Sequence, residues 1–353
     1  MHHRYPDSFG TVPLIVLAVL TLCLAPERVE SSAHGTAAMR NAAAPQGHVV
    51  PQEGVVPDLE TRLRVHIDSL AGAGGTGSRV VFTEGNRRAV AYVLRAMANE
   101  TKEVRADTFM VRRRSTRANY PLVNPVAIVR GASDSLIVVA AHIDASASRD
   151  GGWEGNWMHM RAPGADDNAS GIAAMLETLA LVAHAPARPH YTVMFVACNG
   201  EERNPDYAGM SHHDGHHLGS RWLASMLKER GAKVKGAIVM DMVGWNPRGN
   251  YTPVFSSGRS LWLARELVAL QGRLRLDLEL GTRCGPCDKS DNDSFDRVGI
   301  PAVLLMESCA PWRNDARHPR NPGYHSSRDT RAYITWPILY NVTRLVAAYA
   351  MSQ

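Results

Sequence analysis

Continuous apolar runs alternate with amphipathic segments along most of the chain. Four runs have the composition of strands covered on both faces: 136–141, 192–197, 237–240 and 301–306. The spacing of apolar residues elsewhere predicts helices at 59–70, 86–98, 172–183, 220–230, 262–270 and 336–350. Further strands are predicted at 104–111, 122–129 and 274–280. This alternation predicts an α/β fold, a three-layer α/β/α sandwich whose mixed central sheet is mostly parallel, with helices on both faces.

Composition favours one large domain. The chain has 353 residues, of which 45% are hydrophobic, enough to fill a substantial core, and we assign one large domain to residues 51–353. The 39 basic and 34 acidic residues leave a mild positive charge. The densest basic cluster, Arg112–Arg114 with Arg117, has no interleaved aromatic residues, which is typical of a solvated strand edge or loop. We therefore expect no nucleic-acid partner.

The first 50 residues differ in composition from the rest. Thr11–Ala25 contains about a dozen mostly apolar residues behind a short polar start, the length of a signal-peptide core and short for a transmembrane helix. Residues 1–25 are thus predicted to be a signal peptide, or an N-terminal anchor if they are not cleaved. Residues 26–50, rich in Ala, Pro, Ser and Gln, read as a flexible leader. The prediction is an exported protein, periplasmic or extracellular, that meets a membrane only through an uncleaved segment.

Two of the five cysteines form a short motif, Cys284-Gly285-Pro286-Cys287. As a string it resembles a thioredoxin-type redox pair, but that pair opens a helix early in a small βαβ unit. Here the motif falls in a late loop of a large domain. In an exported protein, a structural disulfide between Cys284 and Cys287 is the better interpretation.

Carboxylates and imidazoles gather where the predicted buried strands end. His142, Glu201, Glu202 and Asp241 each come just after such a strand, and Pro163–Gly171 carries two adjacent aspartates. Ligands bind at the carboxyl ends of parallel strands, and this mixture of side chains suits zinc. One Asp serving as a bridge, with a histidine and another carboxylate on each side, is one way to build a two-metal hydrolase. Of the two aspartates, Asp166 is expected to have only a local role at the helix N-terminus.

Five motifs occur in a fixed order, and together they resemble the di-zinc exopeptidases over about residues 55–350. The motifs are His-x-Asp at 142–144, Gly-Ala-Asp-Asp-Asn-Ala-Ser-Gly at 164–171, Gly-Glu-Glu at 200–202, Met-Asp-Met-Val-Gly at 240–244 and Tyr-His-Ser at 324–326. A Gly77-Ser78-Arg79 turn supports the resemblance. That family includes secreted bacterial aminopeptidases, aminopeptidase Y, glutamate carboxypeptidase and, as a divergent branch, glutaminyl cyclase.

The resemblance implies a role for each matching residue. His142 and Asp241 would hold one Zn²⁺, Glu202 and His325 the other, and Asp167 would bridge them. Glu201 would be the general base for a water that both ions activate. Asp144 would accept the imidazole N–H of His142, and the Tyr324 hydroxyl would stabilise the oxyanion. Asp329 is a further supporting candidate.

The chain departs from the family pattern in two loops and one residue. Arg203–His217 is inserted after Glu202 and is rich in histidine; we interpret it as a polar surface loop, the alternative being a pocket rim or an extra metal site. Ser146–Ala162 is enlarged and carries Trp153 and Trp157, which could wall a pocket or pack on the fold; the sequence leaves both open. Asn292 stands where the family often has histidine.

The most specific prediction is a secreted aminopeptidase acting on peptides with a free N-terminus. A glutaminyl-cyclase-like enzyme needs one zinc, so the presence of both His142 and Asp241 disfavours it. A carboxypeptidase of the same fold stays open. A binding or receptor-like domain on a dead peptidase fold is the alternative of another class, which the intact ligands and Glu201 disfavour. The sequence does not determine the oligomeric state or the preferred residue.

Overall fold

The computed structural model describes residues 59–210, 215–285, 290–307 and 319–353, all within one compact unit. Eight α-helices are assigned there: α1 Leu59–Ala71, α2 Glu84–Glu100, α3 Trp153–Asn156, α4 Gly171–Ala183, α5 Leu218–Glu229, α6 Leu261–Leu274, α7 Asn292–Arg297 and α8 Trp336–Ser352. The predicted signal segment 1–25 and leader 26–50 lie outside the described residues. No helix among the described residues is long and apolar enough to cross a membrane.

Eight strands form one mixed sheet in the order β1-β2-β4-β3-β5-β8-β6-β7. Their bounds are β1 Val104–Arg112, β2 Asn119–Val129, β3 Ser133–His142, β4 Tyr191–Cys198, β5 Val234–Met240, β6 Tyr251–Ser256, β7 Glu279–Cys284 and β8 Ala302–Leu305. The central strands β4, β3, β5 and β8 are parallel to one another, and antiparallel pairs occur toward both edges. The predicted mostly parallel, mixed sheet is confirmed.

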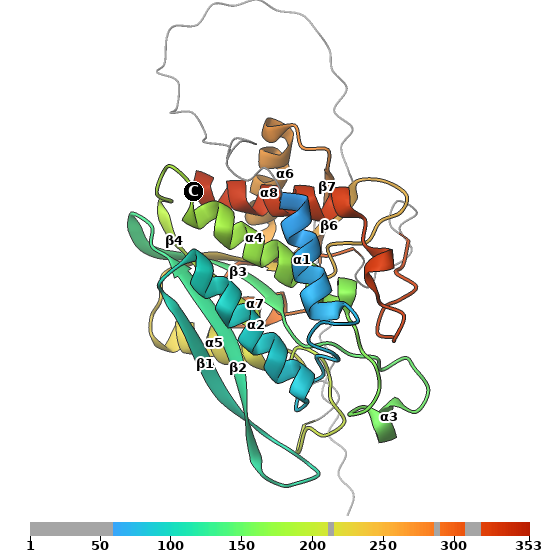
Figure 1. Ribbon diagram of the computed structural model, residues 1–353. Coiled ribbons are helices and arrows are strands. Elements are labelled where there is room, and N and C mark those ends of the chain that lie inside the picture. The colour runs from blue at the N-terminus through green and yellow to red at the C-terminus, as the bar shows by residue number, and fades with distance from the viewer. Residues whose placement is uncertain (1–58, 211–214, 286–289, 308–318) are drawn as a thin grey trace, which may run out of the picture. The chain divides into compact units, whose positions relative to one another are not determined.

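Alternate residues of the central strands face opposite helical layers. In β3, Ile137, Val139 and Ala141 pack with α1, α2, α4, α6 and α8, whereas Val138 and Ala140 pack with α5 and α7. This is the period of two expected for a strand buried on both faces. Figure 1 shows the larger group of helices on one side of the sheet. The three-layer α/β/α arrangement is therefore confirmed.

The parallel register brings distant polar residues to one edge of the sheet. His142 is the last residue of β3 and pairs with Cys198, the last residue of the parallel strand β4. Asp241 directly follows β5, on the other side of β3. The chain after β4 continues into Glu201 and Glu202. The three strand ends therefore deliver the predicted ligands to a common place.

Pattern alone missed α3, α7 and β6, and it placed the start of β7 too early. The strand β6 contains Pro253, which lacks an N–H and argues against an interior strand, yet β6 lies between β8 and β7. The predicted strand 274–280 is wrong at its start: α6 runs through Leu274, Arg275 closes the helix at φ 51°, and β7 begins at Glu279. Cys284 ends β7, but Cys287 lies outside the described residues, so the disulfide stays a prediction.

A buried arginine ties the edge of the sheet to the loop that carries the aspartates. The Arg79 side chain is fully buried and donates to the carbonyl oxygens of Ile143 at 2.8 Å, Pro163 at 2.5 Å, Gly164 at 2.8 Å and Leu70 at 3.2 Å. Burial lowers the pKa of Arg79 to about 10, against the raising effect of nearby carboxylates, so it stays charged at neutral pH. Its planar fork reaches several segments at once.

Arg79→Lys should lower the free energy of unfolding by about 3 kcal/mol, because one ammonium cannot satisfy four buried carbonyl oxygens. Chemical denaturation of wild type and variant measures the difference. Arg95→Lys, on the exposed face of α2, is the matched control and should change it by less than about 0.5 kcal/mol. Equal stability of the two variants would contradict the structural role of Arg79.

Candidate metal centre

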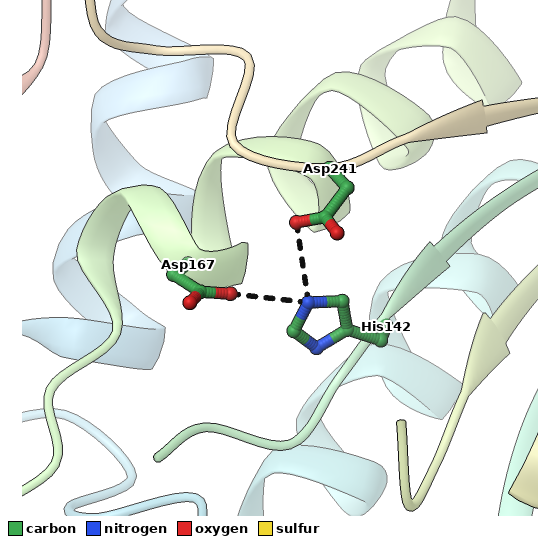
Figure 2. Close-up of side chains that lie close together, drawn as sticks. All are labelled: His142, Asp167 and Asp241. Atoms are coloured by element: carbon green, nitrogen blue, oxygen red, sulfur yellow. Dashed lines mark hydrogen bonds and ion pairs between the residues drawn. The ribbon is translucent and has the colours of Figure 1, made fainter. Parts of the chain in front are cut away.

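His142, Asp167 and Asp241 form one tight group at the end of β3. The Nε2 atom of His142 lies 3.1 Å from Asp167 Oδ1 and 3.3 Å from Asp241 Oδ1. Figure 2 shows the two carboxylates facing the same nitrogen of the imidazole, each from a different element. All three residues are buried. They come from β3, the stretch before α4 and the end of β5.

Asp167, Glu202 and His325 form a second group beside the first. His325 Nε2 lies 3.2 Å from Asp167 Oδ2 and 3.0 Å from Glu202 Oε1. Asp167 thus offers Oδ1 to one histidine and Oδ2 to the other. The five predicted ligands are brought together, with Asp167 at the shared position.

The two groups fit zinc. Each offers one imidazole nitrogen and two carboxylate oxygens, with the ligand atoms within 4.8 Å of one another. Tetrahedral Zn²⁺ has Zn–N and Zn–O bonds of about 2.0–2.1 Å, which separate neighbouring ligand atoms by about 3.3 Å. The observed 3.0–3.3 Å agrees. Three protein ligands for each ion leave a position open, as in catalytic rather than structural zinc sites.

The charges of this centre favour cations. Burial lowers the pKa of His142, but Asp241, Glu201 and Asp167 outweigh it and hold that pKa well above its usual value. Burial is likewise outweighed at His325, where Glu202 and Asp167 raise the pKa to about 10. Both shifts have the same cause, the negative charge of the buried carboxylates around the two imidazoles. Zn²⁺ bound to these atoms would offset that charge.

The carboxylate of Asp329 fixes the bridging aspartate. Its two oxygens accept the backbone N–H groups of Asp166 at 3.0 Å and Asp167 at 2.9 Å. Gly164 precedes them at φ +56°, and a Cβ there would lie 2.2 Å from the Asp167 carbonyl oxygen and 2.9 Å from Arg79 Nη2. Only glycine fits this approach. The predicted supporting residue Asp329 therefore acts on the backbone before α4.

The contact of Asp144 with His142 differs from the predicted one. His142 Nδ1 lies 3.2 Å from the backbone carbonyl oxygen of Asp144, while the Asp144 carboxylate is 3.8 Å away. That carboxylate instead accepts the backbone N–H groups of Gly200, Glu201 and Glu202 at 3.0–3.1 Å. One residue therefore orients the histidine with its main chain and the Gly-Glu-Glu turn with its side chain.

The purely local role predicted for Asp166 is wrong. Its buried carboxylate accepts the backbone N–H of Gly244 at 2.8 Å and the side-chain amide of Asn321 at 2.9 Å. Asp166 thus joins the stretch before α4 to the segment after β5 and to the segment that leads to His325. The helix-cap interpretation considered only neighbours in sequence, and these partners are 78 and 155 residues away.

Glu201 and Tyr324 lie next to the two groups without belonging to either. Burial raises the pKa of Glu201 well above its usual value, which suits a group that must take up a proton near neutral pH. The Tyr324 ring stacks on His325, with centroids 3.8 Å apart, and Arg149 lies over the ring at 4.4 Å. Burial also raises the pKa of Tyr324, so its hydroxyl keeps its proton.

The described part of the inserted loop is not the polar surface loop that we predicted. Asn204, Asp206, Tyr207 and His217 are buried, and His217 Nε2 lies 3.1 Å from Glu201 Oε1. His212, His213 and Asp214 lie outside the described residues. The contact of His217 was missed, although its place as the last residue of the insertion, where the chain returns to the family pattern, was a usable signal.

The enlarged loop 146–162 covers the fold. Trp153 and Trp157 are buried in an aromatic and aliphatic cluster that includes Phe82 and Tyr207. Phe82 meets Trp157 edge-on at 6.3 Å and Tyr207 at 5.6 Å. The buried tryptophans therefore serve packing. The same loop also reaches the centre, because the Ser148 hydroxyl lies 3.0 Å from His325 Nδ1.

The sheet, its helices and the shared Asp167 define an α/β protein with two adjacent histidine–carboxylate groups, to which three strand ends, the segment before α4 and the segment before α8 contribute. A model of Peptidase family M28 matches residues 124–350, and the chain belongs to that family.

The chain is similar to fungal proteins and to bacterial structures. A probable leucine aminopeptidase of Trichophyton verrucosum (strain HKI 0517) is 30% identical over 217 residues, which cover 61% of this chain and 53% of that protein. One of Arthroderma benhamiae (strain ATCC MYA-4681 / CBS 112371) is 30% identical over 211 residues, covering 59% and 51%. This chain thus spans about half the length of these curated relatives.

Two solved structures share the fold. A leucine aminopeptidase precursor from Bacteroides thetaiotaomicron superposes with a TM-score of 0.69 at 18% identity, covering 87% of this chain and all of that one. A glutaminyl cyclase from Fimbriiglobus ruber gives 0.67 at 20%, covering 89% and 100%. At these identities the comparisons establish the fold alone.

Asp329→Asn should weaken zinc binding by about 10–100-fold, because one of the two backbone N–H groups before α4 loses its charged acceptor. Zinc retained per chain after dialysis against a graded series of chelator concentrations measures this. Asp134→Asn, at an exposed aspartate, is the control and should behave as wild type. Wild-type zinc retention in Asp329→Asn would contradict the orienting role.

Proposed function

We propose that the protein is a two-zinc aminopeptidase that removes N-terminal residues from peptides. The observation that carries the proposal is the bridging position of Asp167, whose two oxygens face two different histidines. His142, Asp167 and Asp241 would hold one ion, and Asp167, Glu202 and His325 the other. Membership of Peptidase family M28 and similarity to probable leucine aminopeptidases support this assignment.

The residues around the two groups divide the reaction between them. Bound zinc would make a water acidic enough to attack near neutral pH and would polarise the peptide carbonyl. Glu201, which is not one of the five ligands, would take the proton of the attacking water and pass it to the leaving amine. The Tyr324 hydroxyl would donate to the carbonyl oxygen as negative charge develops there. The acidic surroundings would attract the free α-amine of the substrate, which confines cleavage to the chain end.

Residues 1–25 support a further part of the proposal, export to the periplasm or the extracellular space. N-terminal sequencing of protein isolated from its native host would test it. A mature chain that begins after the apolar run would support export. A chain still carrying the run in a soluble fraction would contradict it.

Glu201→Gln should lower kcat by about 10²–10⁴-fold on aminoacyl-anilides while about two zinc ions per chain are retained, because only the proton acceptor is lost. Glu202→Gln, one residue further on, is the matched control and should lose both zinc and activity. Zinc analysis beside initial rates separates the two effects. Full activity of Glu201→Gln would contradict its role as base.

Other substrates, tested beside the anilides and together with zinc analysis, distinguish the competing activities. Release of ammonia from peptides with N-terminal glutamine, with one zinc per chain, would move the protein to the glutaminyl cyclase branch. Hydrolysis of N-blocked peptides from the C-terminus would indicate a carboxypeptidase. A protein that binds no zinc and turns over none of these substrates would fit a binding domain.

Removing zinc should destabilise the protein. The buried carboxylates of the two groups repel one another when no cation is bound. An ion that binds only the folded state, at a free concentration 100 times its Kd, stabilises that state by about 2.7 kcal/mol. Thermal unfolding should therefore shift to lower temperature after treatment with a chelator and return on addition of Zn²⁺ but not Mg²⁺. An unchanged midpoint would argue against tightly bound metal.

A further inference from the structure

The predicted base has a histidine partner supplied by the inserted loop. His217 Nε2 lies 3.1 Å from Glu201 Oε1, and the side chains of both residues are more than 90% buried. Burial lowers the pKa of His217, which favours a neutral ring, and a neutral ring can carry its single N–H on Nε2, facing the carboxylate. The close contact is with Oε1, and no hydrogen bond among the described residues reaches the Glu201 side chain from another residue.

The main chain holds His217 against the Gly-Glu-Glu turn. The backbone N–H groups of His217, Leu218 and Gly219 donate to the carbonyl oxygens of Glu201, Gly200 and Asn199 at 3.0, 2.8 and 3.0 Å. His217 itself has φ 57°, in the left-handed region that costs a non-glycine residue free energy. The two ends of the insertion are thus joined beside the base.

The first part of the insertion is anchored independently. Asp206 accepts the backbone N–H of Ser115 at 2.6 Å, the hydroxyl of Ser115 at 2.8 Å and the Arg113 guanidinium at 2.7 Å. Tyr207 packs edge-on against Phe82. This part of the loop is therefore fixed against the β1–β2 hairpin and the aromatic cluster.

We propose that His217 is a positioning residue for Glu201. Its Nε2–H holds Oε1 and leaves Oε2 to exchange the proton during peptide hydrolysis. A carboxylate held by one oxygen keeps a single rotamer, so the free oxygen is in place at each turnover. This inference rests on the proposed peptidase function. It gives the insertion a catalytic purpose, because the imidazole comes from its last residue.

Two other roles would produce the same contact. His217 could merely fill space beside a buried carboxylate, or it could bind a metal ion. Neither of the two metal-binding groups among the described residues includes it. The experiment has to separate orientation of Glu201 from packing and from metal binding.

Three single variants make that separation. His217→Leu keeps most of the volume and removes the donor, and His217→Gln restores an N–H donor at nearly the same reach. His159→Leu, the same change at an exposed histidine, is the control. On aminoacyl-anilides we expect His217→Leu to lose about 10-fold or more in kcat with KM changed less than about two-fold. We expect His217→Gln to recover most of that loss and His159→Leu to resemble wild type. Zinc per chain should not change in any of them.

A second measurement does not depend on turnover. In chelator-treated protein, unfolding midpoints of His217→Leu, Glu201→Leu and the double variant form a double-mutant cycle. If the two side chains are paired, each single variant leaves a buried polar partner without its hydrogen bond. The double variant should therefore be destabilised by clearly less than the sum of the singles. Additive shifts would overturn the pairing.

The kinetic outcomes are equally decisive. Unchanged kcat in His217→Leu, with an active wild type, would show that His217 is a bystander. A loss of zinc in the same variant would make it a ligand, and failure of His217→Gln to recover rate would favour packing. If wild type hydrolyses none of the substrates, the proposed function fails, and the catalytic role of His217 fails with it.

Discussion

The accumulation of buried carboxylates at the carboxyl ends of the central strands is the constraint on which this structure depends. Asp144, Asp167, Glu201, Glu202 and Asp241 are all nearly inaccessible to solvent. Unpaired buried charge is costly, so each carboxylate needs donors or cations. The fold meets this need with backbone N–H groups, with two histidines and with Arg79. The remaining negative charge is what a pair of zinc ions would neutralise.

The support for the centre is built mostly from main chain. Asp144 collects three backbone N–H groups of the Gly-Glu-Glu turn, and Asp329 collects two before α4. Arg79 acts in the opposite sense by donating to backbone carbonyl oxygens of neighbouring segments. Side chains that fix backbone fix several neighbouring ligands at once. This arrangement places ligands precisely even though they come from distant parts of the chain.

The inserted loop, a departure from the family pattern, packs against the rest of the fold. It lies against the β1–β2 hairpin through Asp206 and against the aromatic cluster through Tyr207. Its last residue, His217, contacts Glu201. A histidine-rich composition favoured a solvated loop. Burial of His217 results from contacts with segments that the composition of the loop cannot reveal.

The sequence alone determined the layers of the fold and the candidate ligands. Apolar runs of strand length require cover on both faces. Because His142 and Asp241 follow such runs directly and Glu202 follows one within a few residues, chain order was sufficient to place them at one edge. Only the tertiary structure decided the partners of Asp166, the double use of Asp144 and the contact between His217 and Glu201. It also decided the interior position of β6 despite Pro253. These features depend on hydrogen bonds between residues far apart in the chain, and periodicity along the sequence carries information about burial but not about which distant group completes each bond.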